Sequence, residues 1–83
     1  MKELLIFIAK NLVEFPDEVS VTEVEKENGS TLELRVAPSD MGRVIGRHGR
    51  VAREIRTLVK SVAIRENKWI NVDIIESATE ETN

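Results

Sequence analysis

The chain has 83 residues and a mass of 9.4 kDa, which is the size of one small domain. It contains no cysteine, which excludes a disulfide framework, a cysteine-ligated zinc site and a thiol nucleophile. The longest apolar run, residues 4–9, is far shorter than the roughly 20 residues that span a bilayer, so we expect no membrane insertion. A cysteine-free domain of this size fits the reducing cytosol, and we expect a soluble cytoplasmic protein.

The charges are segregated along the chain. The formal net charge is −3, but residues 43–60 carry six basic side chains and only one acidic side chain, while acidic groups prevail on both sides. Five of the six are arginines, at spacings of three and four: Arg43, Arg47, Arg50, Arg53 and Arg56. Such a run is compatible with a solvated helix face, but the planar guanidinium group suits phosphate and glycines lie among these arginines, which favours a docking face for an anion.

Apolar residues at helical spacing predict a first helix within residues 2–15. Pro16 ends it, because a residue that precedes proline is disfavoured in the helical region. Most of the apolar stripe is expected to face the core. Phe7 and Phe15 fall partly off the stripe and are candidates for a contact with another protein.

Two β-rich runs follow, at residues 19–24 and 32–36. Between them Asn28-Gly29 is typical of a tight hairpin turn. The alternation of apolar residues in the first run is broken at Val24, which predicts a bulge or the end of regular pairing.

The second half of the chain predicts two helices and a strand. Ser39 is a suitable N-cap for a short helix at about residues 40–45, and a longer amphipathic helix of about four turns follows over residues 51–63. Residues 69–75 alternate as a third strand, with Trp69 at its head expected to cap the core.

The order α-β-β-α-α-β predicts an α+β fold in which a three-stranded mixed sheet has its helices on one face. The first two strands form an antiparallel hairpin, and the connection through two helices is long enough to bring the third strand in parallel to the second. The other sheet face is expected to be wet; it carries Glu33, Arg35, Asn71 and Asp73. Residues 1–76 form the single domain, and residues 77–83 are expected to be a frayed, polar and acidic tail.

The most informative stretch is the glycine-containing segment at residues 42–50. It lacks the Lys-Ser or Lys-Thr of a phosphate-binding P-loop, and its glycines follow a helix rather than the strand that a dinucleotide fingerprint requires. What remains is I-G-x-x-G between two helices. Two glycines let a sugar-phosphate chain approach the backbone, and the next helix directs its positive end at the loop. A tight interhelical turn with incidental arginines is the alternative.

In this context the sequence resembles the KH domain of type II, and within it the small bacterial single-KH RNA-binding proteins. The resemblance covers nearly the whole chain except the tail, and its most specific part is residues 40–60. Ala52 departs from the broader KH pattern, which often has isoleucine there, but is similar to the small bacterial family.

The resemblance implies a single-stranded RNA-binding protein in which the loop clamps the backbone of about four nucleotides. Gly46, Arg47, His48 and Gly49 would form the clamp. Val44 and Ile45 would form the apolar floor of the groove, with Val36 on the opposite wall. Arg43, Arg50 and Arg53 would neutralise the RNA backbone near the mouth of the groove. The resemblance also implies a homodimer, a heterodimer with a second, larger KH protein, and a role as an RNA chaperone or post-transcriptional regulator in cell elongation, division and cell-wall homeostasis.

Two other classes of function fit the sequence less well. An enzyme is disfavoured, because His48 has no nucleophile or orienting carboxylate near it in sequence and the carboxylates lack the spacing of a metal cluster or an acid/base pair. No cofactor and no metal are expected. The alternative from a different class is a protein-interaction module that keeps the KH fold with little RNA binding of its own.

Overall fold

The structure is a computed structural model that describes residues 1–77. The elements follow in the order α1 (Lys2–Lys10), β1 (Ser20–Lys26), β2 (Gly29–Val36), α2 (Met41–Ile45), α3 (Arg50–Arg65) and β3 (Ile70–Glu76). The predicted α-β-β-α-α-β order is therefore confirmed. The predicted tail at 77–83 lies outside the described residues, except for Ser77.

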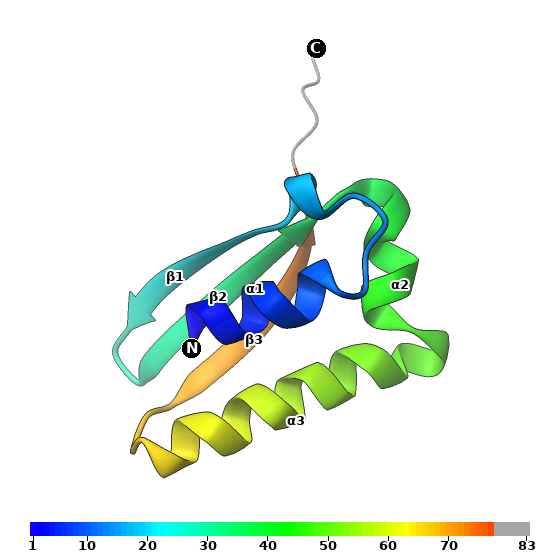
Figure 1. Cartoon of the computed structure of the whole chain (residues 1–83). Coiled ribbons are helices and arrows are strands. Elements are labelled where there is room, and N and C mark those ends of the chain that lie inside the picture. The colour runs from blue at the N-terminus through cyan, green and yellow to red at the C-terminus, as the bar shows by residue number, and fades with distance from the viewer. Residues whose placement is uncertain (78–83) are drawn as a thin grey trace.

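The sheet has the strand order β1-β2-β3, with β1 antiparallel and β3 parallel to the central strand β2. Helices α1 and α3 both lie over one face of this sheet, while α2 stands at its side (Figure 1). A mixed three-stranded sheet with helices on one face is what the sequence predicts. No helix within residues 1–77 is long and apolar enough to cross a membrane.

The core forms where the sheet meets the helices. Leu32 and Leu34 alternate along β2 on the helix side and are fully buried, as are Leu5 and Ala9 of α1. From α3, the buried residues recur at intervals of three and four: Ala52, Ile55, Val59 and Ala63. The apolar period of two in the strand and of about 3.6 in the helix thus meet in one core.

The predicted bulge at Val24 is wrong. Pairing between β1 and β2 continues without interruption, and Val24 stands opposite Thr31 while Val21 stands opposite Leu34. Because successive residues of a strand point to opposite faces, Val24 lies on the outer face of the sheet and Val21 on the helix side. The outer face also carries Glu33 and Arg35, which are half-buried and form an ion pair at 3.1 Å.

The hairpin turn is where the sequence places it, but its central residues differ. Lys26 pairs with Gly29, so Glu27 and Asn28 form the two-residue loop. Gly29 has φ +130°, and a Cβ there would come within 2.7 Å of the Trp69 Cβ. Gly29 therefore permits the close approach of β3 to the hairpin.

The prediction that Trp69 caps the core is wrong. The Trp69 side chain lies just before β3 and is 72% exposed. A hollow of about 980 Å³ lies at this hairpin end of the molecule, between the turn and the start of β3, and Trp69 is among its lining residues. Three carboxylates also line it: Glu23, Glu25 and Glu27. Carboxylates thus outnumber the one lysine, Lys68, among its lining side chains, and the hairpin end lies on the opposite side of the molecule from the α2–α3 loop (Figure 1).

Helix α1 ends at Lys10, five residues before the predicted limit. The Asn11 side-chain amide donates to the Phe7 carbonyl at 2.8 Å and so satisfies one of the last free carbonyl groups of the helix. The segment after Asn11 leaves the helix and crosses toward α2, where Asp40 holds it.

Candidate nucleic-acid interface

The loop between α2 and α3 is built from backbone conformations that most residues avoid. Gly46, His48 and Gly49 have φ of +77°, +58° and +73°, so three of the four loop residues have positive φ. The Gly49 N–H donates to the Gly46 carbonyl at 3.1 Å and closes the turn. His48 pays a steric penalty of roughly 1–2 kcal/mol for this conformation because it carries a Cβ.

The two loop glycines are needed for different reasons. A Cβ on Gly46 would collide with Val51 of α3, lying 2.8 Å from both its Cβ and its backbone nitrogen. A Cβ on Gly49 would meet no atom within 4 Å, so only its positive φ favours glycine. Gly46 therefore lets α3 pack against the end of α2, whereas Gly49 lets the chain turn into α3.

Exposed basic and imidazole side chains surround the loop at the start of α3. Arg47 and His48 lie in the loop, and Arg50 begins the helix; all three are exposed. The positive end of the helix dipole is directed at the same place. Arg53, one turn into α3, donates from Nη2 to the His48 carbonyl at 3.3 Å and so braces the loop.

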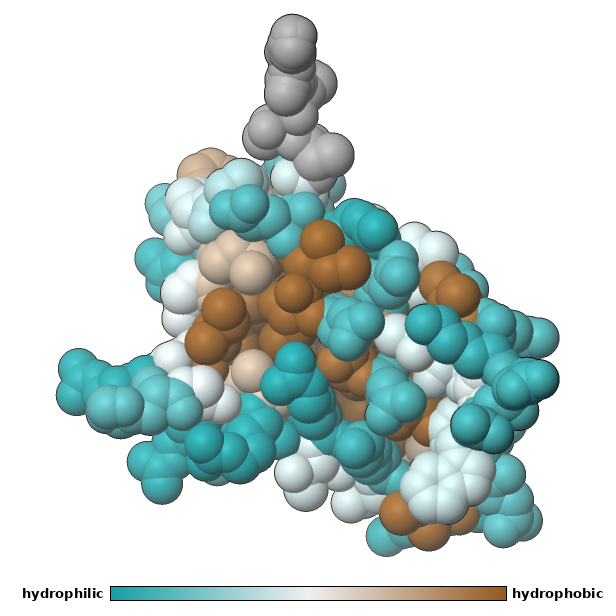
Figure 2. Space-filling model, turned by 180° about the vertical axis from the view of Figure 1, so that it is seen from behind, coloured by the Kyte–Doolittle hydropathy of each residue, from teal (hydrophilic) through white to brown (hydrophobic). Residues whose placement is uncertain are grey.

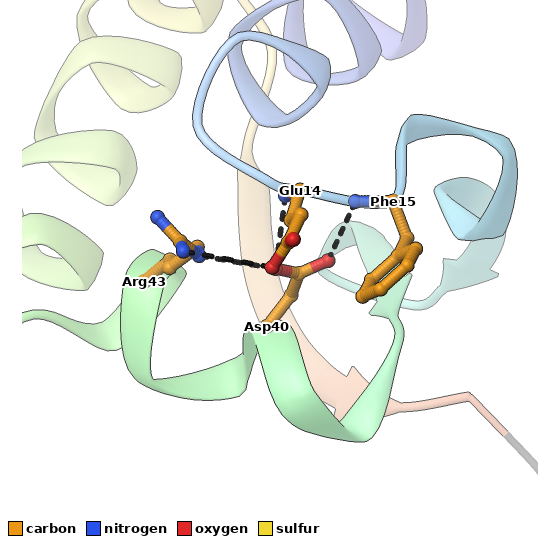
Figure 3. A network of polar contacts seen from close by, with 4 residues as sticks. All are labelled: Glu14, Phe15, Asp40 and Arg43. Atoms are coloured by element: carbon orange, nitrogen blue, oxygen red, sulfur yellow. Dashed lines mark hydrogen bonds and ion pairs between the residues drawn. The ribbon is translucent and has the colours of Figure 1, made fainter.

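Arg43 is held differently from the other predicted cations (Figure 3). Its Nε lies 3.3 Å from Asp40 Oδ1, and its Nη2 lies 3.7 Å from Glu14 Oε1. Two carboxylates thus already compensate the charge of Arg43. It is better placed to fix α2 against the loop after α1 than to contact a ligand.

Asp40 is a site residue that sequence analysis did not identify. Its side chain is fully buried, and its two oxygens accept hydrogen bonds from the backbone N–H groups of Glu14 and Phe15, at 2.9 and 3.0 Å (Figure 3). The predicted Ser39 cap does not form; Pro38–Asp40 is a 3-10 turn, and α2 begins at Met41 without a side-chain cap. No local pattern reveals this role, because Glu14 and Asp40 are 26 residues apart.

The predicted apolar floor is only partly at the surface. Ile45 is 37% exposed, but Val44 is fully buried and belongs to the core beneath it. Val36, predicted on the opposite wall, is also fully buried and so presents no surface to a ligand. The molecule seen from behind has apolar side chains gathered at the centre of the view, bordered by hydrophilic ones (Figure 2).

Arg56 connects α3 to the free edge of the sheet. Its Nε donates to the Val72 carbonyl of β3 at 3.0 Å. Since β3 pairs only with β2, this carbonyl points away from the sheet toward α3. The arginine that lies furthest along the run therefore supports the position of α3.

The described residues offer no metal-ligand cluster: among residues 1–77, no group of three His, Asp or Glu side chains is placed to hold a metal ion. The site consists of the glycine-containing loop, the N-terminus of α3 and the exposed arginines Arg47 and Arg50. That arrangement suits a polyanion.

An α-β-β-α-α-β chain whose two central helices are joined by I-G-x-x-G is a KH domain of type II. A family model described as the KH domain of KhpA/KhpB matches residues 2–74. The chain therefore belongs to the KhpA/KhpB family of KH domains.

Its relatives include proteins named RNA-binding protein KhpA. The one from Clostridium acetobutylicum is 57% identical over 75 residues, which is 90% of this chain and 100% of that protein. The one from Clostridium perfringens is 56% identical over the same shares of the two chains. The one from Chlamydia trachomatis is 47% identical over 76 residues, which is 92% of this chain and 97% of that protein.

Proposed function

We propose that this chain binds single-stranded RNA, and that the loop Gly46–Gly49 contacts the sugar-phosphate backbone. The observation that carries the proposal is the position of this bare, positive-φ loop at the start of α3, next to exposed Arg47 and Arg50. The names of the KhpA relatives support RNA as the ligand.

The site residues divide by role in this proposal. Gly46 and Gly49 shape the loop, while Arg47 and Arg50 supply charge and His48 supplies a hydrogen-bond donor to phosphate. Arg53 braces the loop through His48 and adds charge. Three other predicted residues contribute beside the loop: Ile45 as an apolar contact, Val44 as its support, and Arg43 as a fixed charge on α2. The buried Val36 has no part in the proposal.

The test is fluorescence anisotropy of a labelled single-stranded RNA with the wild type and two double variants, at two salt concentrations. Arg47→Asp/His48→Asp changes the loop. Asn67→Asp/Lys68→Asp is the matched control, because it makes the same formal charge change beyond the other end of α3, and Asn67 shares the positive φ of His48. Circular dichroism checks that both variants are folded.

We expect the loop variant to lose at least about tenfold in affinity, the control to bind close to the wild type, and wild-type affinity to fall with salt because phosphate contacts release counterions. If both variants lose affinity equally, the loop is not the site. If the wild type does not bind RNA, the proposed function is wrong.

We further propose that the protein acts in the cytoplasm as an RNA chaperone or post-transcriptional regulator, together with a KhpB-like KH protein, in cell elongation, division and cell-wall homeostasis. A domain that reads about four nucleotides binds weakly by itself, so a heterodimer or homodimer would gain affinity through avidity. Co-purification of this chain with a KhpB-like protein tests the partnership.

One observation favours the alternative, a protein-interaction module of the KH fold. Several large apolar side chains are exposed on the helices and before β3: Phe7, Leu58, Ile64 and Trp69. Exposed apolar side chains of this size are used at protein interfaces. The alternative gains support if the wild type shows no salt-dependent binding to RNA.

A further inference from the structure

The hollow at the hairpin end is a part of the sheet that the helices leave uncovered. It lies between the start of α1 and the end of α3, and it is lined both by Met1, which precedes α1, and by Trp69, which follows α3 (Figure 1). Ser30 of β2 and Ile70 of β3, which pair with each other, also line it. Ser30 is on the same face of β2 as Leu32, so the hollow opens on the helix side of the sheet.

The carboxylates of this hollow are not compensated by the protein itself. None of the three, Glu23, Glu25 and Glu27, forms an ion pair with another group in residues 1–77. The ammonium group of Lys68 lies 3.8 Å from Glu66 instead. Glu23 and Glu25 are exposed and, being two residues apart in β1, point to the same side of the sheet. Unpaired carboxylates side by side attract a cationic partner.

The tryptophan distinguishes this hollow from an ordinary charged edge strand. Carboxylates on an edge strand are common, because charge there prevents pairing with a strand of another molecule. That reason does not explain an exposed tryptophan, a residue that is usually largely buried. The backbone of Trp69 is fixed, since its carbonyl accepts the Ser30 N–H at 2.9 Å and Gly29 leaves the space that its Cβ needs. The fold thus holds an exposed indole beside three carboxylates.

An indole beside carboxylates suits an organic cation. The face of tryptophan attracts a guanidinium or ammonium group, and a carboxylate accepts charge-assisted hydrogen bonds from the same groups. Arginine fits both partners, because its planar guanidinium stacks on an aromatic ring and carries five N–H donors. A metal ion does not fit, since among residues 1–77 no three acidic side chains are placed to hold one.

The spacing of the acidic side chains favours an extended peptide over a single cation. Glu23 and Glu25 are two strand positions apart, which is about 7 Å. Alternate side chains of a second extended chain repeat at the same distance, so its basic residues can meet these two carboxylates in turn. A volume of about 980 Å³ accommodates several side chains.

We propose that the hollow at the hairpin end binds an extended basic segment of another protein, with arginine or lysine at alternate positions. Glu23 and Glu25 pair with its cations, and a further basic side chain stacks on Trp69. This surface is separate from the candidate RNA site, because the loop precedes α3 and the hollow lies beyond the other end of that helix. The inference therefore does not depend on RNA binding.

The test measures binding of two synthetic peptides to the full chain, by Trp69 emission and by anisotropy of a labelled peptide. Both have three arginines and four serines; one has arginine at positions 1, 3 and 5, and the other at positions 1, 4 and 7. Glu23→Gln/Glu25→Gln removes two carboxylates of the hollow. Asp17→Asn/Glu18→Gln, before the opposite end of β1, is the control with the same change in charge. Circular dichroism checks that both variants are folded.

We expect the peptide with alternating arginines to change Trp69 emission saturably, with an affinity that falls as salt rises. It should bind about threefold more tightly than the other peptide, whose successive arginines point to opposite sides when it is extended. Glu23→Gln/Glu25→Gln should weaken binding about fivefold, while the control should bind as the wild type does. Trp69→Leu, followed by anisotropy, should weaken binding about threefold.

Several results would overturn the inference. Unchanged Trp69 emission at millimolar peptide would show that the hollow binds no basic segment, and an equal loss of affinity in the two double variants would reduce the effect to net charge. Equal affinity of the two peptides would remove the extended segment. Spermidine that changes the emission at the same concentration as the peptide would make the occupant a small amine. Emission that changes with protein concentration alone would make it a second copy of this chain.

Discussion

His48 and the two glycines around it show how much local strain the loop contains. A residue with a side chain avoids the left-handed conformation, yet His48 occupies it between Arg47 and Gly49. Strained backbone of this kind persists only where the surrounding structure holds it. Here the Arg53 guanidinium on the His48 carbonyl and the packing of Gly46 against Val51 do so.

The two loop glycines should therefore respond differently to alanine. Gly46→Ala should lower the free energy of unfolding by about 2–4 kcal/mol, because it adds both a positive-φ penalty and a collision with Val51. Gly49→Ala should lower it by only about 1 kcal/mol, because its Cβ points into open space. Urea unfolding followed by circular dichroism measures both, and equal losses would contradict this account.

At the scale of single residues, the I-G-x-x-G pattern marks the segment that has positive φ in the structure, but several apolar residues do not lie where the sequence predicts them. The alternation of apolar and polar residues predicts that Val36 and Arg35 point to opposite faces of the sheet. The alternation does not distinguish a Val36 side chain that lines a groove from one that is covered by a helix. In the structure Val36 is fully buried. The position of Trp69 at the head of the third strand predicts that it caps the core. In the structure its backbone and Cβ lie against Gly29 of the hairpin while the indole is exposed, and no local pattern reveals this contact between distant segments.

The shortest of the three α-helices, α2, depends on its neighbours for its position. It has five residues and no side-chain cap, so it is not stable by itself. Asp40 joins it to the segment after α1 by accepting two hydrogen bonds from backbone N–H groups, and Arg43 adds an ion pair with Glu14 across the same junction. The start of the candidate site is thus held by the part of the chain that precedes β1.

Removing the Asp40 carboxylate should loosen this junction. Asp40→Ala leaves two backbone N–H groups without their acceptor and should lower the free energy of unfolding by about 2–4 kcal/mol. Arg43→Gln should cost less than about 1 kcal/mol, because the Arg43 side chain is mostly exposed and surface ion pairs contribute little. Urea unfolding gives both values, with Asp17→Ala as the control at an exposed carboxylate. A larger loss for Arg43→Gln than for Asp40→Ala would contradict the role assigned to Asp40.

The order of elements and the sheet topology were predictable because each follows from a local pattern. The spacing of apolar residues distinguishes helices from strands. The connection through two helices is long enough to predict that β2 and β3 pair in parallel. The end of α1 was not predictable. The apolar pattern continues to Val13, but the Asp40 carboxylate accepts hydrogen bonds from the N–H groups of Glu14 and Phe15. A contact between residues this far apart in the chain has no local sequence pattern that predicts it.

Over the whole molecule, the charges are separated between the two ends of α3. The helix has 16 residues and is about 24 Å long; the arginine-rich loop precedes it, and the acidic hairpin end follows it. The far end also carries Arg65 and Lys68 beside its carboxylates, so a polyanion is attracted most strongly to the loop, and RNA should approach in one orientation.

This separation predicts which cations determine the salt dependence of RNA binding. Arg47→Gln and Arg50→Gln should each reduce the magnitude of the slope of log affinity against log salt by about 0.7, the contribution of one phosphate contact in a single strand. Lys10→Gln and Lys68→Gln, which remove the same charge away from the loop, should leave the slope unchanged. Anisotropy at four or more salt concentrations measures the slopes. A similar reduction in all four variants would mean that net charge, and not the loop, governs binding.

The exposed indole of Trp69 has a practical consequence for these measurements. Trp69 is the single tryptophan of the chain, and the chain has no tyrosine. Apart from the weak emission of phenylalanine, all intrinsic fluorescence therefore comes from Trp69. Because the indole is already in water in the folded state, its emission maximum should shift little on unfolding, which is why circular dichroism is the better probe of stability here. The same isolation makes Trp69 a built-in optical reporter of the hairpin end: an added molecule that quenches it has bound there, and one that binds only at the loop leaves it unchanged.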